Sequence, residues 1–161
     1  MPGMQGGPLM HVIAAKAVAF KEALDPSFKT YIKGVLDNAQ CFAEEFLSKG
    51  YNLISGGTDT HQVLIDLQNK KISGKAAELS LDEAGITVNK NMIPYDPKSP
   101  FVTSGIRIGS PAITTRGMGV NEVKIIVDLI DQVIVNHDNK EKIQSIKNQV
   151  NELCSSFPIY D

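Results

Sequence analysis

The order of helix-like and strand-like segments constrains the fold of this chain more than any other feature. Segments with apolar residues at helical spacing alternate along the chain with short segments rich in β-branched and other strand-favouring residues. Turns that contain glycine or proline separate many of these segments. In chain order they predict helices at 9–24 and 27–49, strands at 51–54 and 62–67, a helix at 73–84, strands at 86–88 and 105–109, and helices at 122–135 and 140–155. This order favours an α+β fold, in which a small mixed or antiparallel sheet has helices packed on one face.

Capping and turn residues mark the ends of several segments. Gly50 follows the second helix as a C′ glycine, and Ser73 precedes the third helix as an N-cap. Asn121 is the expected N-cap of the helix that begins at residue 122. The remaining proline-, glycine- and asparagine-rich segments, 89–99 and 110–119, are predicted to be loops.

The first predicted helix, 9–24, is apolar on most of its sides. Its apolar residues include Val12, Ile13, Val18 and Phe20, which spread around the helix and do not form a single stripe. A helix of this kind is normally buried. One small domain cannot cover all of these sides, so we expect the helix to dock on a partner or to cause self-association.

Composition narrows the classes of partner. The 161 residues include 16 basic and 18 acidic side chains, a net charge of −2 and no basic block, which argues against nucleic acid as the main partner. No apolar run approaches the roughly 20 residues of a membrane span, and no signal peptide is visible. Cys41 and Cys154 lie far apart in helical contexts and fit reduced cytosolic thiols. The histidines share no ligand spacing, so no metal site is expected.

Arg107 is the first candidate for a binding residue. It lies within a strand-like run, between Ile106 and Ile108, and small or rigid residues flank that run. A guanidinium held among small residues suits two-pronged capture of a carboxylate, which a lysine cannot provide. The alternative is a surface arginine on an edge strand. A second arginine, Arg116, is expected to anchor its own loop through carbonyls or a carboxylate.

Four segments of the chain closely resemble serine hydroxymethyltransferases and occur in the order of that family. They are PGMQGGPLMHVIAAKAVAF at 2–20, SGGTDTH at 55–61, NKNMIPYDPKSPF at 89–101 and SPFVTSGIRIGSPAITTRG at 99–117. The resemblance implies a pyridoxal phosphate (PLP) enzyme of the aspartate-aminotransferase-like fold. Such an enzyme is a cytoplasmic homodimer that interconverts serine and glycine with tetrahydrofolate and 5,10-methylenetetrahydrofolate.

The resemblance also implies roles for individual residues. Arg107 would bind the carboxylate of the amino-acid substrate, and Asn91 would hydrogen-bond the pteridine ring of the folate. Phe101 would flank the folate, with a place in the core as the alternative. Gly6 and Gly7 would approach the PLP phosphate of the neighbouring subunit; read alone, they form a flexible loop. Thr60 stands where the family usually has Asn, a difference we expect to be structural.

The family's PLP-binding lysine lies in a Thr-Thr-His-Lys segment that precedes the Gln-Gly-Gly-Pro segment. No Thr-His-Lys tripeptide occurs in this chain. Lys90 is not expected to replace it, because it lies among polar residues and a catalytic lysine needs desolvation to lower its pKa. The chain therefore resembles about the C-terminal two fifths of the enzyme, with no catalytic residue of its own, and is expected to be inactive alone.

The resemblance divides the chain into two parts. Residues 1–25 would be the end of the large PLP domain and an interface helix, and residues 26–161 would be the C-terminal small domain. The alternative of another class is a non-catalytic truncated or split-gene module that acts through assembly with a partner. A third possibility is an unrelated α+β ligand-binding domain.

Overall fold

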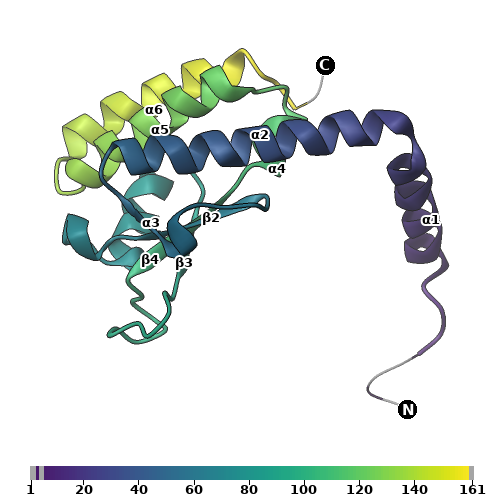
Figure 1. Cartoon of the computed structure of the whole chain (residues 1–161), viewed down its shortest axis with the longest axis horizontal. Helices are drawn as coiled ribbons and strands as arrows, with labels where there is room; N and C mark the ends of the chain where they lie inside the picture. Colours follow the sequence, from purple (N-terminus) through teal and green to yellow (C-terminus); the bar gives the residue numbers. More distant parts are fainter. Residues whose placement is uncertain (1–2, 4–5, 160–161) are drawn as a thin grey trace. The chain divides into compact units, whose positions relative to one another are not determined.

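The computed structural model describes residue 3 and residues 6–159. The chain divides into two compact units, Met1–Lys33 and Gly34–Asp161. The boundary falls within helix α2, Pro26–Ser48 (Figure 1).

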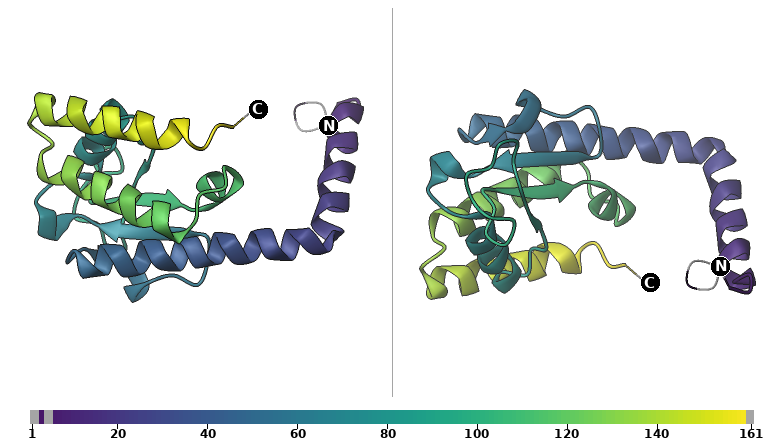
Figure 2. Two further views of the ribbon diagram at one scale, coloured as in Figure 1. Left: turned by 90° about the horizontal axis from the view of Figure 1, so that it is seen from above. Right: turned by 90° about the horizontal axis from the view of Figure 1, so that it is seen from below.

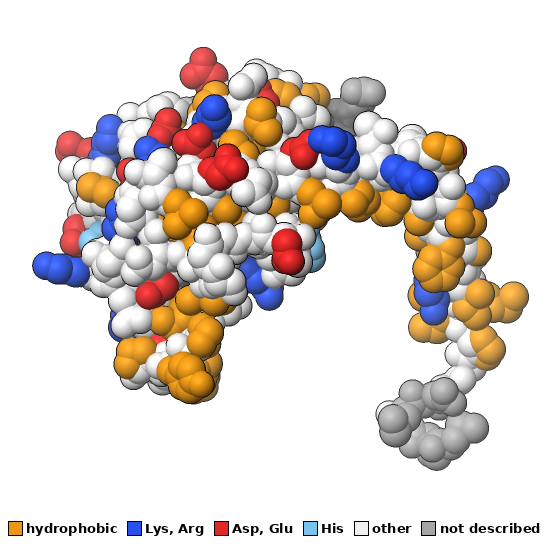
Figure 3. All heavy atoms as spheres, in the orientation of Figure 1, with side chains coloured by type: hydrophobic (Ala, Val, Ile, Leu, Met, Phe, Trp, Pro, Cys, Tyr) orange, Lys and Arg blue, Asp and Glu red, His pale blue; other side chains and the backbone are white. Residues whose placement is uncertain are grey.

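The first unit contains helix α1, Met10–Leu24, and the beginning of α2. None of the residues of α1 is buried. Its large apolar side chains are exposed, with Phe20 at 67% and Val18 at 58%, and Figure 3 shows hydrophobic side chains along this helix. The carboxylate of Asp25 accepts a hydrogen bond from Ser27 N–H at 2.9 Å, so Asp25 caps α2 as its residue type allows.

The second unit is built on a four-stranded antiparallel sheet. The strands are β1 (Asn52–Leu53), β2 (Gln62–Asp66), β3 (Asn89–Asn91) and β4 (Gly105–Gly109). Their order in the sheet is β1-β2-β4-β3, and each neighbouring pair is antiparallel. The α+β prediction is confirmed, and of the two expected sheet types the antiparallel one is present. Strand β4 lies inside the sheet, whereas β3 forms an edge.

The helices of this unit pack on one face of the sheet. They are the part of α2 after Lys33, α3 (Gly74–Glu83), α4 (Pro111–Thr115), α5 (Val120–Val135) and α6 (Lys140–Ser155). Figure 2 shows α2, α5 and α6 side by side over the strands. Alternate residues of β2 and β4, such as Ile65 and Ile106, are fully buried in one core with Val127 and Ile130 of α5. Each such side chain contributes about 1.5–3 kcal/mol to stability.

Two predicted boundaries in the middle of the chain are wrong. The strand expected at 86–88 is irregular, and the neighbouring residues 89–91, expected to be a loop, form β3. Val88 is buried all the same. Residues 86–88 are therefore apolar because Val88 packs in the core, and no strand is needed to explain the pattern. Strand β3 forms because its main chain pairs with β4.

The segment after β4 also differs from the prediction, because residues 111–115 form the short helix α4 and not a loop. Pro111 is compatible with the first turn of a helix, and Thr114 Oγ1 donates to Ser110 O at 2.9 Å. The N-cap of α5 is Gly119 and not Asn121. Glu122 Oε2 accepts the Gly119 N–H at 2.8 Å, which satisfies this end of the helix. Ser73 caps α3 as expected.

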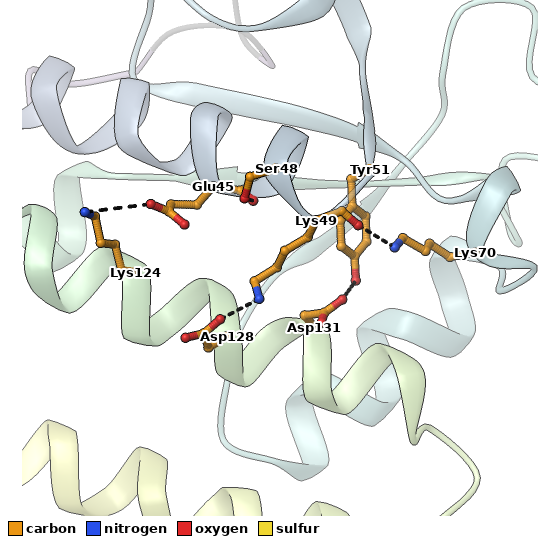
Figure 4. A network of polar contacts seen from close by, with 8 residues as sticks. All are labelled: Glu45, Ser48, Lys49, Tyr51, Lys70, Lys124, Asp128 and Asp131. Atoms are coloured by element: carbon orange, nitrogen blue, oxygen red, sulfur yellow. Dashed lines mark hydrogen bonds and ion pairs between the residues drawn. The ribbon is translucent and has the colours of Figure 1, made fainter.

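A polar network joins the end of α2 to α5 (Figure 4). The buried Tyr51 donates its hydroxyl to Asp131 Oδ1 at 2.7 Å, and Lys70 Nζ lies 4.0 Å from the centre of its ring. Lys49 pairs with Asp128. Burial, together with the hydrogen bond and the charge of Asp131, raises the pKa of Tyr51, so this hydroxyl stays protonated and its role is structural.

Candidate functional site

Arg107 lies on β4 between two other strands. Leu64 of β2 is its partner on one side and Asn89 of β3 on the other. Because successive side chains of a strand point to opposite faces, the buried Ile106 and Ile108 place Arg107 on the face away from the core. The edge-strand alternative is therefore wrong, since this arginine is exposed on an interior strand whose main chain is fixed on both sides.

The guanidinium of Arg107 has no protein partner in the part of the chain that the structure describes, where it makes neither a hydrogen bond nor an ion pair. Arg116 is different, because its Nε donates to Phe157 O at 2.7 Å and its Nη2 to Cys154 O at 2.9 Å. The anchoring role expected of Arg116 is thus confirmed. A guanidinium carries five N–H donors, and those of Arg107 remain available to an anion.

Arg107 and Asn91 line the same open pocket, which has a volume of about 790 Å³. Strands β2, β3 and β4, helix α2 and the loop between β1 and β2 all contribute to it. The lining residues are Gln40, Ile54, Ser55, Gly56, Gly57, Thr58, Asp59, Thr60, Gln62, Leu64, Asn91 and Arg107. The antiparallel pairing of β3 and β4 is what brings Asn91 to this pocket, where it lies opposite Gly105.

The loop 54–60 forms one rim of the pocket and is held by hydroxyl groups. Thr58 Oγ1 donates to Gln62 O at 2.6 Å and accepts from Thr60 N–H at 3.1 Å. Thr60 Oγ1 in turn accepts from Gln62 N–H at 3.3 Å, a turn contact that supports the structural role expected of this residue. Ser55 has a left-handed backbone with φ of +64°, which is uncommon for a residue other than glycine.

Asn91 is part of β3, and its side chain is only partly exposed. Its Nδ2 donates to Met92 O at 2.7 Å. Within the described residues the structure gives its Oδ1 no hydrogen bond, so an acceptor remains for a ligand. The neighbouring Lys90 forms an ion pair with Glu78 of α3 at 3.2 Å.

The other predicted site residues do not line this pocket. Phe101 is 81% exposed on the loop between β3 and β4, so the core alternative for it is wrong. Met92, Tyr95 and Val102 are exposed on the same loop, and Figure 3 shows hydrophobic side chains gathered there. Gly6 and Gly7 belong to the first unit, where a Cβ atom on either would have no neighbour within 4 Å.

Asp96 organises the loop between β3 and β4, and sequence reasoning missed it. Its carboxylate accepts hydrogen bonds from Ile93 N–H, Lys98 N–H and both the N–H and the hydroxyl of Ser104, at 2.7 to 3.2 Å. Desolvation alone would raise the pKa of Asp96, but these hydrogen bonds lower it to about 2. The sequence predicts a loop at 89–99, but residue types alone do not show that Asp96 binds Ser104, eight positions further along the chain.

The residues that line the pocket offer a guanidinium, an amide and hydroxyl groups, which suit a carboxylate. No lysine is among the described residues that line the pocket.

Residues 3 and 6–159 contain no group of three side chains able to hold a metal ion. None of the helices described is both long and apolar enough to cross a bilayer.

The fold and pocket together define an α+β domain that presents an arginine, without a partner among the described residues, on the open face of a sheet. The family model for serine hydroxymethyltransferase matches residues 1–130. A curated serine hydroxymethyltransferase from Dichelobacter nodosus (strain VCS1703A) is 60% identical over 159 residues, which are 99% of this chain and 38% of that relative. The chain belongs to the serine hydroxymethyltransferase family and spans about two fifths of the length of this relative.

Proposed function

We propose that this chain supplies the substrate-binding sheet of a PLP-dependent serine hydroxymethyltransferase. The complete enzyme would interconvert serine and glycine, with tetrahydrofolate as the one-carbon acceptor. The observation that carries this proposal is the Arg107 guanidinium, which has no partner among the described residues and lines an open pocket together with Asn91. Family membership supports the reaction class, and the geometry supports a part in it for these two residues.

Arg107 would bind and orient the amino-acid carboxylate. The planar fork of a guanidinium matches the two oxygens of a carboxylate, and each of the two hydrogen bonds is strengthened by charge. Strands β2 and β3 pair with the arginine main chain on its two sides, so the substrate would be held at a defined distance from the sheet. Such positioning would itself contribute to catalysis, because the entropic cost of reaching the reactive orientation is then met when the substrate binds.

Asn91 would recognise the folate. A side-chain amide offers both donor and acceptor groups, which suits the mixed edge of a pteridine ring. Its unused Oδ1 supports this role. Phe101 would flank the folate from the adjacent loop, where its exposed ring can reach a partner molecule.

PLP would lie against residues from more than one part of the complete enzyme. When bound, this cofactor acts as an electron sink for cleavage of the bond between the α- and β-carbons of serine. Gly6 and Gly7 would offer main-chain N–H groups to its phosphate across a cytoplasmic homodimer. The lysine that binds PLP would come from the remaining part of the enzyme, because Lys90 is held by Glu78.

A chimera tests this proposal directly. Residues 1–161 replace the matching 38% of the Dichelobacter relative, and conversion of serine to glycine is measured with tetrahydrofolate. We expect the chimera to be active. We expect the chain alone to show no turnover and no lysine labelled after incubation with PLP and borohydride reduction.

Three results would contradict the proposal. A chimera that folds and binds PLP but does not turn over would show that these residues do not supply the substrate site. Turnover by the chain alone, or stoichiometric labelling of one of its lysines, would show that it carries its own catalytic lysine. The alternative of a non-catalytic module predicts the first of these results.

A further inference from the structure

The edge strand β3 carries Asn91 to the pocket, although it is only three residues long. It pairs with a single neighbour, β4. A strand this short, paired on one side, cannot be held firmly by its main-chain hydrogen bonds alone. The neighbours of its other side therefore decide how firmly Asn91 is placed.

Glu78 of α3 holds the outer side of β3 through both of its carboxylate oxygens. Oε1 accepts the main-chain N–H of Lys90 at 2.9 Å, and Oε2 pairs with Lys90 Nζ at 3.2 Å. The N–H of Lys90 thus donates to a side chain and not to another strand. The side chains of Glu78 and Lys90 are 25% and 34% exposed, so the pair is partly shielded from water.

The inner side of β3 fits tightly against β4 at Gly105, which is the partner of Asn91 in the sheet. A Cβ atom on Gly105 would lie 3.1 Å from Asn91 O and 2.9 Å from Ile93 Cγ2. The main chain around Asn91 is therefore enclosed between a close backbone contact and a carboxylate. This arrangement leaves the main chain at Asn91 little freedom to move away from the pocket.

We propose that Glu78 is a positioning residue, which fixes β3 through Lys90 so that the Asn91 amide meets the folate beside Arg107. This inference rests on the proposed function, because it takes the ligand of Asn91 from there. Glu78 touches no substrate and acts only through β3. The hydrogen bond from Lys90 N–H lowers the pKa of Glu78, which is consistent with a carboxylate that stays charged in this position.

Steady-state kinetics of the active chimera test the inference, with KM measured separately for tetrahydrofolate and serine. We expect Glu78→Ala to raise the KM for tetrahydrofolate about fivefold to tenfold and to leave the KM for serine nearly unchanged. Glu78→Gln should restore most of the loss, because its amide oxygen can still accept the Lys90 N–H. Glu83→Ala is the matched control, since Glu83 is exposed on the same helix.

A double-mutant cycle separates positioning from a general effect on stability. If Glu78 acts through Asn91, then Glu78→Ala causes no further rise in the KM for tetrahydrofolate when Asn91→Ala is already present.

Hydrogen exchange of the 161-residue chain gives an independent measure. Glu78→Ala should speed exchange at Asn91 N–H, and Glu83→Ala should not. If Glu78→Ala does not fold, Glu78→Asp replaces it, since its shorter side chain cannot reach both groups of Lys90.

The outcomes distinguish the two proposals. If Asn91→Ala weakens folate use and Glu78→Ala does not, the positioning role is wrong and the proposed function stands. Additive losses, or equal losses for both substrates, would also overturn the positioning role. If Asn91→Ala leaves folate use unchanged, the folate contact in the proposed function is wrong and the positioning role fails with it.

Discussion

At the scale of single residues, Asp96 shows how one carboxylate can hold a loop that contains three prolines. Its hydrogen bonds from Ile93, Lys98 and Ser104 connect the end of β3 to the start of β4. These bonds favour the charged form, so the pKa of Asp96 in the folded chain is about 2, against an ordinary value of 3.8. The stabilisation is therefore complete above pH 4 and is lost as the pH falls from about 4 to 2.

We predict that Asp96→Asn lowers the free energy of unfolding by about 1–2 kcal/mol at pH 7, after allowance for solvent screening. The difference between wild type and variant should shrink as the pH approaches 2, because the wild-type carboxyl then becomes neutral too. Urea unfolding of the chain at several pH values measures this. Asp82→Asn, at an exposed position of α3, is the control. A difference that does not change with pH would show that the charge of Asp96 is unimportant.

The sequence identified Arg107 because its neighbours are small and its strand pattern is clear. It did not identify the rim of the pocket. That rim depends on hydroxyl contacts such as Thr58 to Gln62 and on the pairing of β2 with β4, and both are set by the tertiary fold. A pair such as Gly56–Gly57 is typical of a turn, but residue types alone do not show which face of the sheet the turn covers.

At the scale of elements, apolar periodicity predicted the long helices well and the short polar elements poorly. Helices α2, α5 and α6 have clear apolar stripes, and the ends of all three, like those of α1, lie close to those expected. Strand β3 has the sequence Asn-Lys-Asn, which has low intrinsic strand propensity. It forms because its main-chain groups have hydrogen-bond partners on both sides, in β4 on one side and at Glu78 on the other.

Strand β4 offers a direct test of how tightly the sheet is packed. A Cβ atom on Gly105 would lie 2.7 Å from Ile65 O, so Gly105→Ala must push two strands apart. We predict a loss of about 1–3 kcal/mol in the free energy of unfolding, measured by urea denaturation. Gly109→Ala is the matched control, because its nearest contacts would be at an ordinary 3.7 Å. Equal effects of the two substitutions would show that β4 has room at Gly105.

At the scale of the whole molecule, α1 has no residue buried although it is rich in apolar side chains. Exposed apolar surface of this extent favours association. We predict that the 161-residue chain self-associates in a concentration-dependent way, as measured by light scattering. A variant with Ile13→Gln, Val18→Gln and Phe20→Gln should associate less. A monodisperse wild-type monomer with α1 helical and solvated would contradict this prediction.

The resemblance of the chain to one family, inferred from four segments, is confirmed by the match over residues 1–130. The chain spans about two fifths of the length of the Dichelobacter relative. In the proposed function, Arg107 is the residue of this chain that binds the amino-acid substrate, so its role is the central claim to test.

Titration of the active chimera with serine tests that role most directly. Arg107→Ala should weaken serine binding and leave PLP bound. If substrate binding buries the charge pair that Arg107 would form, loss of one partner costs about 2–5 kcal/mol, or roughly thirtyfold to several-thousandfold in affinity. Arg107→Lys should also bind serine poorly, since it keeps the charge and loses the fork. Thermal melts of the 161-residue chain should barely shift with either substitution. Normal serine binding by Arg107→Ala, or strong destabilisation of the chain, would show that Arg107 is a structural residue.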